Sequence, residues 1–456
     1  MTDYADLVQA DRVHSAIFTD EGIYQAELAN IFHRYWVYVA HESEIPETGD
    51  YCTKWIGDKQ VIVSRGADGE IGVFLNRCRH RGAAVCMEEY GNASFFRCPY
   101  HGWTYNTAGD LVGVPYPSRY GPEFNRATLG LARVPRVGSV AGFLFASLAD
   151  DGPSLDEHLG QAAAYLTDFV RASPRGSVSL SAGTSKSVFW GNWKFVGMDG
   201  YHTNFTHKTV LDLRQRKAGP GFQRGAGNSD RSPNESWDLG NGHCRLDLTR
   251  RDKVGIGVAS NVAIAAGIPD NEAGREYFRL MTEAYGEDVP ETIRRSRDVH
   301  IHIWPNLQLI GSQVRVVRPL AAGRTEVLCY PAMLDGVPDE INTERIRSFE
   351  WFGGVASFGT PDDVEIFERN QLGLRADRIP WLVLGRGLDV QPRADGALVG
   401  NVTDEVPQRA QLGTWLRAMS SGPVPAGPVP AGSGEPRAGG DTAPDLAAAQ
   451  ANGVSR

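Results

Sequence analysis

The sequence predicts an α+β protein in which a small all-β domain precedes a larger domain that combines an antiparallel sheet with helices. From about residue 45, short apolar runs such as KQVIVSRG, EIGVFLN and ASFFRCP are bounded by Gly, Asp and Asn, which is typical of antiparallel strands joined by tight turns. Further along, strand patterns such as QVRVVRPL are mixed with helix patterns such as PDDVEIFERNQLGL. With 456 residues, 41% of them hydrophobic, the chain is long enough to bury both cores.

Four regions are predicted along the chain. Residues 1–40 form an N-terminal helical segment that packs on the larger domain, because TDEGIYQAELANIFHRYW spaces its apolar residues as one face of a helix does. Residues 41–152 form the small β domain, and a helix that begins at Ser154 opens the larger domain of residues 153–420. Residues 421–456 are rich in Pro, Ala and Gly, contain a repeated PVPAG, and are expected to be disordered.

Composition narrows the classes of function. The 46 basic and 55 acidic residues give a net charge of −9, and no run of Lys and Arg could follow a phosphate backbone, so nucleic acid is not an expected partner. The start of the chain lacks a basic region followed by an apolar run, and the apolar stretch near VAGFLFASLA is too short to span a bilayer. We therefore expect a soluble, cytoplasmic protein without a membrane partner, whose six cysteines are thiols or metal ligands and not disulfides.

Two cysteines and two histidines are spaced as metal ligands. CRH supplies Cys78 and His80, and CPYHGW supplies Cys98 and His101 after seventeen intervening residues. A structural zinc ion also accepts two thiolates and two imidazoles, but common zinc motifs take both cysteines from one loop and both histidines from a helix. Here each loop gives one of each, which favours a Rieske [2Fe–2S] cluster with two thiolates on one iron and two imidazoles on the other. Glycines in both loops suit tight turns, and Trp103 can shield the cluster from water.

A second group of candidate ligands lies in the larger domain. DGYHTNFTH contains Asp199, His202 and His207. Much later in the chain, FGTPDDVEIFERNQLGL has a helix pattern with Asp362 and Asp363 near its start. Histidines five positions apart lie about 140° apart around an ideal helix, so a shared metal requires a helix end or a bulge between them. By their spacing alone, His202 and His207 could equally be ordinary histidines with no metal. Acids at the start of a helix often only cap it and complement its dipole. A carboxylate added to two histidines would complete the triad of non-haem Fe(II) oxygenases.

Through these motifs the chain resembles the large (α) subunit of Rieske non-haem iron aromatic-ring-hydroxylating oxygenases, and within them the benzoate, toluate and anthranilate dioxygenase branch. The resemblance runs from about residue 14 to 420 and is carried by NRCRHRGA, FRCPYHGWTYNTAGDLVGVP, DGYHTNFTH, WPNLQL, FGTPDDVEIFERNQLGL and TDEVPQRAQLGTW. It implies a small all-β Rieske domain followed by a catalytic domain of the helix-grip type, with an antiparallel sheet and helices.

The resemblance also implies the role of each candidate residue. The ligands implied for the cluster are Cys78, His80, Cys98 and His101, and those implied for the catalytic Fe(II) are His202, His207 and Asp363. Asp363 is preferred over Asp362 because relatives often have Glu-Asp at this pair. Asp199 matches the family's bridging Asp, which links the ligand His202 to a cluster histidine, here His101, of a neighbouring subunit. Relatives usually have a longer segment, with a Glu-Asn pair, between NWK and this Asp, whereas only FVGM stands here, so the resemblance does not imply the exact substrate.

The implied function is that of an oxygenase component that takes electrons at a Rieske cluster and activates O₂ at Fe(II) to cis-dihydroxylate an aromatic ring, with an aromatic carboxylate as substrate. NAD(P)H would act only through a separate flavin and iron–sulfur reductase or a ferredoxin, and the chain has no GxGxxG after a strand. The family implies a homotrimer of α subunits, either alone or as α3β3 with a small β subunit. Two alternatives stay open: a Rieske monooxygenase or O- or N-demethylase, and a non-catalytic electron-transfer or sensor protein.

A carboxylate substrate would need a cation or a set of N–H donors in the pocket. The candidates by position are Arg214, Arg216, Arg315 and Arg318. For each, a solvated or interface arginine is the simpler interpretation. In VHIHIWPN, His300 and His302 alternate with apolar residues as in a strand, and we interpret both as structural.

Overall fold

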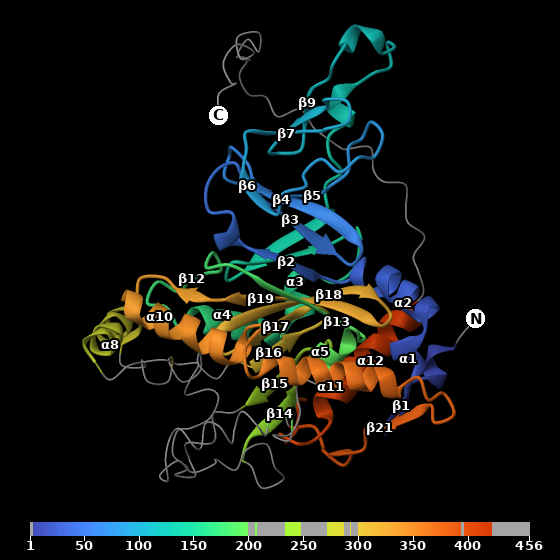
Figure 1. Ribbon diagram of the computed structural model, residues 1–456, viewed down its shortest axis with the longest axis vertical. Helices are drawn as coiled ribbons and strands as arrows, with labels where there is room; N and C mark the ends of the chain where they lie inside the picture. Colours follow the sequence, from blue (N-terminus) through green and yellow to red (C-terminus); the bar gives the residue numbers. More distant parts are fainter. Residues whose placement is uncertain are drawn as a thin grey trace.

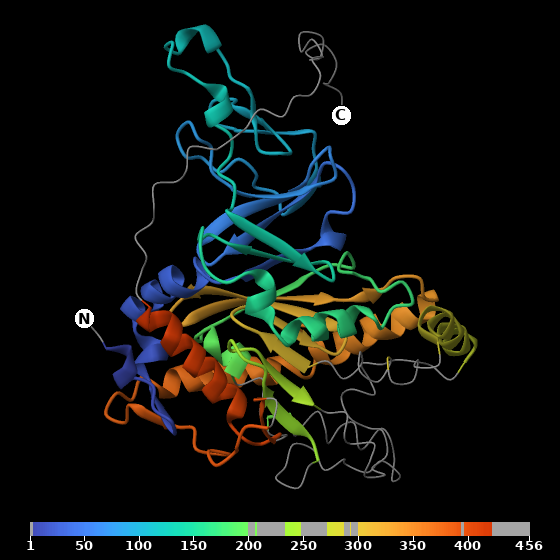
Figure 2. The same ribbon diagram turned by 180° about the vertical axis from the view of Figure 1, so that it is seen from behind.

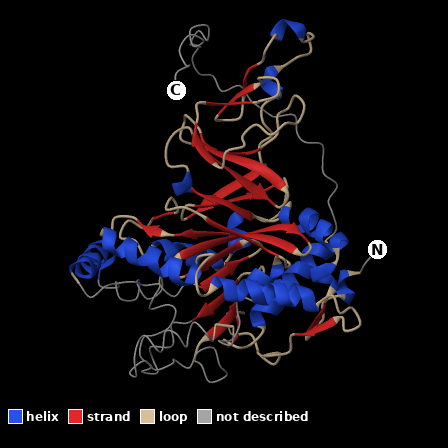
Figure 3. Cartoon of the chain, viewed as in Figure 1, coloured by secondary structure: helices blue, strands red, loops and turns tan. Residues whose placement is uncertain are grey.

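The computed structural model describes residues 3–198, 206–207, 233–247, 271–286, 292, 300–393 and 396–421. Its long axis runs from a narrow upper part made of small sheets to a broad lower part built on one large sheet (Figure 1). Most of the helices flank the large sheet, as the colouring by secondary structure in Figure 3 shows. In the part of the chain that the structure describes, none of the helices combines the length and the hydrophobicity that a bilayer span requires.

The N-terminal helical segment is shorter than the apolar spacing predicts. Its helices are η1 (Tyr4–Asp6), α1 (Ala16–Thr19), α2 (Glu21–Glu27) and the π-helix η2 (Leu28–Phe32). Trp36, expected on the same helix face, lies beyond η2. It is followed by strand β2 (Val37–His41), in which every residue is buried and which pairs with β11 (Phe143–Ser147). The last residues of the predicted helical segment are therefore extended, because pairing in a buried sheet outweighs the helix-like spacing of their apolar side chains.

Three small antiparallel sheets form the upper part of the molecule. Their strands are β10 (Arg136–Val140), β11 and β2; β5 (Ile71–Leu75), β4 (Lys59–Arg65), β3 (Asp50–Ile56) and β6 (Tyr90–Asn92); and β7 (Phe95–Arg97), β8 (Thr104–Asn106) and β9 (Leu111–Gly113). The third sheet lies near the upper end of the molecule (Figure 1). Cys98 directly follows β7 and Trp103 directly precedes β8, so this sheet holds the second cysteine–histidine loop.

An eight-stranded antiparallel sheet forms the centre of the larger domain. In spatial order its strands are β13 (Ser185–Phe189), β19 (Arg324–Pro331), β18 (Gln313–Ala321), β17 (Leu307–Ile310), β16 (His300–Ile303), β15 (Cys244–Asp247), β14 (Glu235–Asp238) and β22 (Leu398–Asn401). Two further pairs are β1 (Arg12–His14) with β21 (Trp381–Val383) and β12 (Val178–Ser179) with β20 (Met333–Leu334). The antiparallel sheets and the flanking helices confirm the predicted α+β class.

The helices that follow the upper part surround this sheet. They are α3 (Leu155–Leu159), α4 (Ala162–Val170), α5 (Lys194–Met198), α8 (Glu272–Tyr285), α10 (Asp339–Ser348), η8 (Phe349–Gly353), α11 (Thr360–Gly373) and α12 (Val406–Ser420). The short helices η3 (Glu42–Glu44), η4 (Pro117–Arg119) and η5 (Arg126–Thr128) connect strands of the upper part. Helix α3 begins after Ser154, as predicted: the Ser154 hydroxyl accepts from the Glu157 N–H at 3.2 Å, and the Glu157 carboxylate accepts from the Ser154 N–H at 2.8 Å. The predicted disordered tail lies outside the described residues, apart from Ser421.

Two buried polar side chains, Asn306 and Glu27, join segments that are far apart in the sequence. Asn306, after β16, accepts from the Tyr38 N–H at 3.0 Å and donates to the Tyr38 carbonyl at 2.9 Å, so the large sheet holds the backbone of β2. Buried Glu27 of α2 accepts from the Lys194 ammonium at 2.5 Å and from the indole N–H groups of Trp193 and Trp415 at 2.8 and 2.6 Å. One carboxylate therefore joins α2, α5 and α12, which lie together in Figure 2.

Candidate metal centres

The first cysteine–histidine loop is a hydrogen-bonded turn. The Cys78 N–H donates to the Ala83 carbonyl at 2.8 Å, and the Gly82 N–H donates to the Cys78 carbonyl at 3.0 Å. Gly82 has φ +79°, a conformation that residues with a Cβ rarely adopt. The turn therefore depends on glycine at this position, and it fixes the direction of the Cys78 side chain.

The second loop repeats this geometry. The Cys98 N–H donates to the Trp103 carbonyl at 2.8 Å, the Gly102 N–H donates to the Cys98 carbonyl at 3.1 Å, and Gly102 has φ +70°. The N–H groups of Tyr100 and His101 favour the thiolate and oppose the effect of burial, which raises the pKa of the Cys98 thiol. Two loops with the same turn thus present one cysteine and one histidine each.

The four predicted cluster ligands lie in two pairs, cysteine beside cysteine and histidine beside histidine. Cys78 and Cys98 are each 2% exposed and their thiols lie within hydrogen-bonding reach, while the rings of His80 and His101 are 4.6 Å apart at an angle of 77°. The Nδ1 atom of His80 is buried without a hydrogen-bond partner in the part of the chain that the structure describes. Within that part, no three His, Cys, Asp or Glu side chains converge on one ion position. This donor set fits a two-iron cluster, in which each iron takes two protein ligands, better than a single tetrahedral zinc ion.

Two aromatic side chains cover the pair of loops. Trp103 is 3% exposed and its ring stacks on His80, with 5.0 Å between centroids, so it shields the imidazole from water. The Tyr105 hydroxyl lies 3.3 Å from the Cys78 sulfur and accepts from the Arg79 N–H at 3.1 Å, which leaves its own proton free for the sulfur. A donor to a ligand sulfur stabilises the reduced cluster, because reduction adds negative charge there. Spacing alone had not identified Tyr105.

The second centre brings together segments more than 150 residues apart in the sequence. The Nε2 atom of His207 lies 3.2 Å from Oδ1 of Asp363, and its Nδ1 atom lies 3.3 Å from Oδ2 of Asp362. Both acids belong to the first turn of α11, whose preceding residue, Gly359, provides no side-chain cap. One imidazole therefore lies between two carboxylates, and these acids do more than complement the dipole of the helix.

Arg315 of β18 lies beside this pair. Its guanidinium is 3.9 Å from Oδ2 of Asp363 and donates to the Thr360 hydroxyl at 3.0 Å, at the start of α11. The ring of Phe352 packs 5.3 Å from the His207 ring and covers it on another side. Arg315 is buried, so its charge is screened little by water and acts directly on the Asp363 carboxylate.

Two of the predicted residues of this centre, Asp199 and His202, lie outside the described residues, as do Arg214 and Arg216. The structure therefore brings together His207 and Asp363 from the predicted set and adds Asp362 and Arg315. Its place beside Asp363 in the same motif made Asp362 a candidate, but no feature of the sequence indicated its contact with the histidine.

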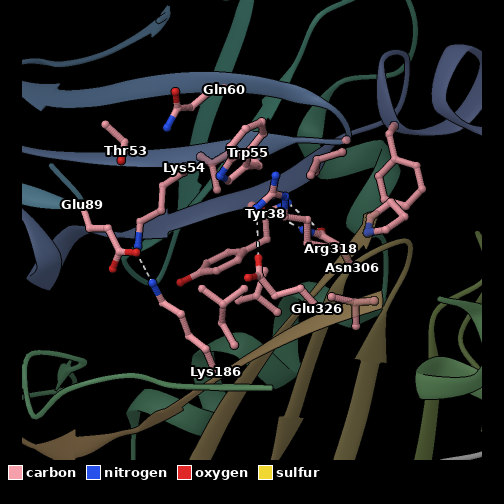
Figure 4. A pocket seen from close by; sticks show the side chains of 18 of the residues that line it. Tyr38, Thr53, Lys54, Trp55, Gln60, Glu89, Lys186, Asn306, Arg318 and Glu326 are labelled. Carbon is pink, nitrogen blue, oxygen red and sulfur yellow. Dashed lines mark hydrogen bonds and ion pairs between the residues drawn. The ribbon is translucent and has the colours of Figure 1, made fainter. Parts of the chain in front are cut away.

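Arg318 is engaged elsewhere, in a cleft of about 260 Å³ between the upper sheets and the large sheet. Figure 4 shows its guanidinium over Trp55, 3.5 Å from the ring, and paired with Glu326 at 3.0 Å, while Lys186 pairs with Glu89 across the cleft. None of the described cysteine, histidine or aspartate candidates lines this cleft. We therefore assign it to the contact between the domains and not to either metal centre, and Arg318 is an interface arginine.

The fold and the two centres define a two-domain protein with a [2Fe–2S] site in one domain and a histidine–carboxylate site in the other. Residues 35–135 match the family of Rieske [2Fe-2S] domains, and residues 180–398 match the catalytic domain of ring-hydroxylating alpha subunits. The chain belongs to the alpha subunits of the ring-hydroxylating dioxygenases. It is an oxidoreductase of the oxygenase class, as predicted, and its cofactors are a Rieske cluster and a non-haem iron.

Individual relatives agree with this assignment. The chain is 33% identical over 397 residues to the anthranilate 1,2-dioxygenase large subunit of Acinetobacter baylyi, with 82% of this chain and 80% of that one covered. It is 34% identical to toluate 1,2-dioxygenase subunit alpha of Pseudomonas putida (81% and 82% covered) and 33% identical to N,N-dimethyl phenylurea N-demethylase subunit alpha of a Sphingobium (78% and 78%). Among solved structures, naphthalene 1,2-dioxygenase from Rhodococcus sp. is similar, with a TM-score of 0.74, 29% identity, and 90% of this chain and 94% of that chain covered.

Proposed function

We propose that this chain is the oxygenase component of a system that cis-dihydroxylates the ring of an aromatic carboxylate. The observation that carries the proposal is the His207 imidazole with Asp363 3.2 Å from its Nε2 atom, in a chain that also carries the two cysteine–histidine loops. The substrate class is supported by two of the similar proteins, which are named for anthranilate and toluate.

The chain's own residues take the following parts. His202, His207 and Asp363 would hold the iron, and Cys78, His80, Cys98 and His101 the cluster. When bound, the iron supplies O₂ activation, because a 2-His-1-carboxylate set leaves metal positions open. With iron bound, we assign the ring proton of His207 to Nδ1, where the Asp362 carboxylate can accept it, so that Nε2 is the donor atom toward the metal. Arg315 and Thr360 hold the start of α11. Among the arginine candidates that the structure describes, Arg315 lies beside the proposed iron ligand Asp363, close enough to attract the carboxylate of a substrate bound near the iron.

A subunit assembly is part of the proposal. The sheet β7–β8–β9, beside the cysteine–histidine loop, and helix α11 lie on opposite sides of the large sheet (Figure 1), which makes a path between the two centres of one chain indirect. We propose a trimer of α subunits, alone or with three small β subunits, in which Asp199 links His202 to His101 of a neighbouring copy. Electrons come from NAD(P)H through a separate reductase or ferredoxin.

The bridging role of Asp199 predicts a specific kinetic defect. Asp199→Asn keeps the size of the side chain and removes its charge, so transfer of an electron from the reduced cluster to the iron should slow by about 10- to 100-fold, the usual effect of losing such a partner. Single-turnover mixing of the reduced protein with substrate and O₂ measures this rate. Iron content and the visible spectrum of the cluster should stay as in the wild type, and a normal transfer rate would contradict the bridging role.

The reaction itself is tested by the fate of labelled oxygen. With a reconstituted reductase and ¹⁸O₂, an aromatic carboxylate should take up both labelled atoms of O₂, two electrons and two protons to give a cis-diol. Incorporation of one labelled atom would indicate a monooxygenase, and release of formaldehyde from an N-methyl substrate would indicate a demethylase, the activity for which the Sphingobium relative is named. An intact cluster without bound mononuclear iron would favour an electron-transfer or sensor protein.

We also place this system in the cytoplasm. The proposal is supported by the six cysteines, which are all buried and of which none forms a disulfide, as expected for a reducing compartment. Fractionation of cells with an antibody to the chain tests it, and recovery with the exported proteins would contradict it.

A further inference from the structure

Three glutamine side chains donate to three consecutive carbonyls of α5, the helix that precedes the predicted iron ligands. Gln411 donates to the Gly197 carbonyl at 2.9 Å and Gln408 donates to the Met198 carbonyl at 3.1 Å. Gln308 donates to the Val196 carbonyl at 3.4 Å, the longest of the three contacts. Lys194, the first residue of α5, is held by Glu27 on its other side. Helix α5 is therefore tied to its surroundings at both of its described ends.

The orientation of these amides follows from their partners. A backbone carbonyl can only accept a hydrogen bond, so the NH₂ group of each glutamine must face it. Gln308 is fully buried and Gln408 and Gln411 are each 5% exposed. The Oε1 atoms of Gln308 and Gln408 have no hydrogen-bond partner in the part of the chain that the structure describes. A buried amide with an unpartnered oxygen is less stable than an apolar side chain of the same size, so packing alone does not account for the glutamines.

The three donors reach α5 from two different elements. Gln408 and Gln411 lie three positions apart on one face of α12, and Gln308 comes from β17 of the large sheet. Consecutive carbonyls of a helix are about 100° apart around its axis. Contacts to three of them from two sides therefore oppose both rotation of α5 about its axis and sliding along it.

A close backbone approach completes this arrangement. A Cβ atom on Gly197 would lie 2.6 Å from Oε1 of Gln411 and 2.7 Å from Nε2 of His302, which are closer than real contacts allow. Gly197 thus lets α5 approach α12 and β16 near enough for the amides to reach its carbonyls. Burial lowers the pKa of His302 to about 3, so its ring is neutral and packs against α5 without adding charge.

We propose that Gln308, Gln408 and Gln411 are positioning residues for the catalytic iron. They hold α5 against rotation about its axis and against sliding along it, and so fix the end of the helix from which the chain continues to Asp199 and His202. The inference rests on the proposed ligand assignment. The shortened segment makes this control more direct, because only four residues separate Lys194 from Asp199. Any rotation of α5 would reach the ligands through few intervening bonds.

The test uses substitutions that keep length and burial but remove the donor. Gln411→Met, Gln408→Met and the double variant Gln408→Met/Gln411→Met are prepared in the full chain with an intact cluster. The matched control is Gln391→Met, because Gln391 also donates to a backbone carbonyl, that of Asp389 at 3.1 Å, but is exposed and on a loop. Two quantities are measured: the dissociation constant for Fe(II) at the mononuclear site, and the EPR spectrum of its nitric oxide adduct, which reports ligand geometry.

In the double variant, we expect the dissociation constant for Fe(II) to rise by about 10- to 100-fold, as for other residues that orient metal ligands, and the nitrosyl EPR signal to split into several species. The cluster's visible and EPR spectra should be unchanged, and Gln391→Met should match the wild type. Wild-type affinity with a single unchanged nitrosyl signal in the double variant would overturn the inference, even if stability falls. Should the double variant not fold, the single variants decide by the same two measurements.

The same data separate this inference from the proposed function. A wild-type protein that binds no Fe(II) and gives no nitrosyl signal would overturn the ligand assignment and the positioning role together. A normal wild-type signal that none of the glutamine variants changes would overturn the positioning role alone.

Discussion

Asp363→Ala should abolish turnover and empty the mononuclear iron site while the visible and EPR spectra of the cluster stay unchanged. Asp363 is the carboxylate on the Nε2 side of His207, 3.2 Å away, and its side chain is only 12% exposed. Without it the set lacks its carboxylate, and we expect a loss greater than the ~10- to 100-fold that an orienting partner costs. The cluster ligands lie in the other domain, so their surroundings do not change. Iron analysis and product formation on the purified variant measure the effect.

Asp362→Ala is the matched control. Both acids stand in the first turn of α11, so either substitution removes a similar favourable interaction with the helix dipole, about 0.3–1 kcal/mol. Asp362 faces the Nδ1 atom of His207 at 3.3 Å, however, and its loss should weaken iron binding or activity by about 10- to 100-fold without abolishing either. The reverse order of effects would show that Asp362 is the ligand. Loss of the cluster signal in Asp363→Ala would show that the residue belongs to the other centre.

Glu27→Gln should destabilise the protein by about 3–5 kcal/mol, because it leaves the buried Lys194 ammonium without its counter-charge. Lys194 is 4% exposed and Glu27 is 1% exposed, and 2.5 Å separates their charged atoms. Burial lowers the pKa of Lys194, and the Glu27 carboxylate opposes that effect. The midpoint of urea unfolding, followed by tryptophan fluorescence, measures the change. Trp193 and Trp415, which both donate to Glu27, are two of the ten tryptophans that contribute to this signal.

The double variant Glu27→Gln/Lys194→Met separates the charge effect from a loss of packing. Removing both partners of a buried ion pair is often nearly neutral, so most of the lost stability should return. If the double variant is as unstable as Glu27→Gln, the contribution of Glu27 comes from its indole hydrogen bonds and not from Lys194. Since Lys194 opens α5, we also expect Glu27→Gln to weaken iron binding more than it affects the cluster.

Local features were predicted well from the sequence, because their physical cause lies within a few residues. The turn around each cluster loop needs a glycine four positions after the cysteine, and Gly82 and Gly102 stand there with positive φ. Ser154 and Glu157 form the capping box that begins α3. The N-terminal helix was predicted too long, because the apolar spacing continues to Trp36 although the chain leaves the helix after Phe32.

The catalytic centre could be predicted only through resemblance. The spacing of His202 and His207 left ordinary histidines as an equal alternative, and no local pattern connects either one with Asp363. The first turn of α11 lies against His207, which makes that contact and also brings in Asp362 and Arg315. The domain boundaries and the complete ligand sets stay predictions.

By itself, the sequence determined the α+β class, the two cysteine–histidine loops, and the family through its motifs, since each of these depends on residues close together in the chain. Only the tertiary structure decided which carboxylate faces which nitrogen of His207, that Glu27 joins α2, α5 and α12, and that three glutamines hold α5. These contacts join residues more than 100 positions apart. The burial of apolar faces against one another sets such contacts, and no local pattern of residues encodes them.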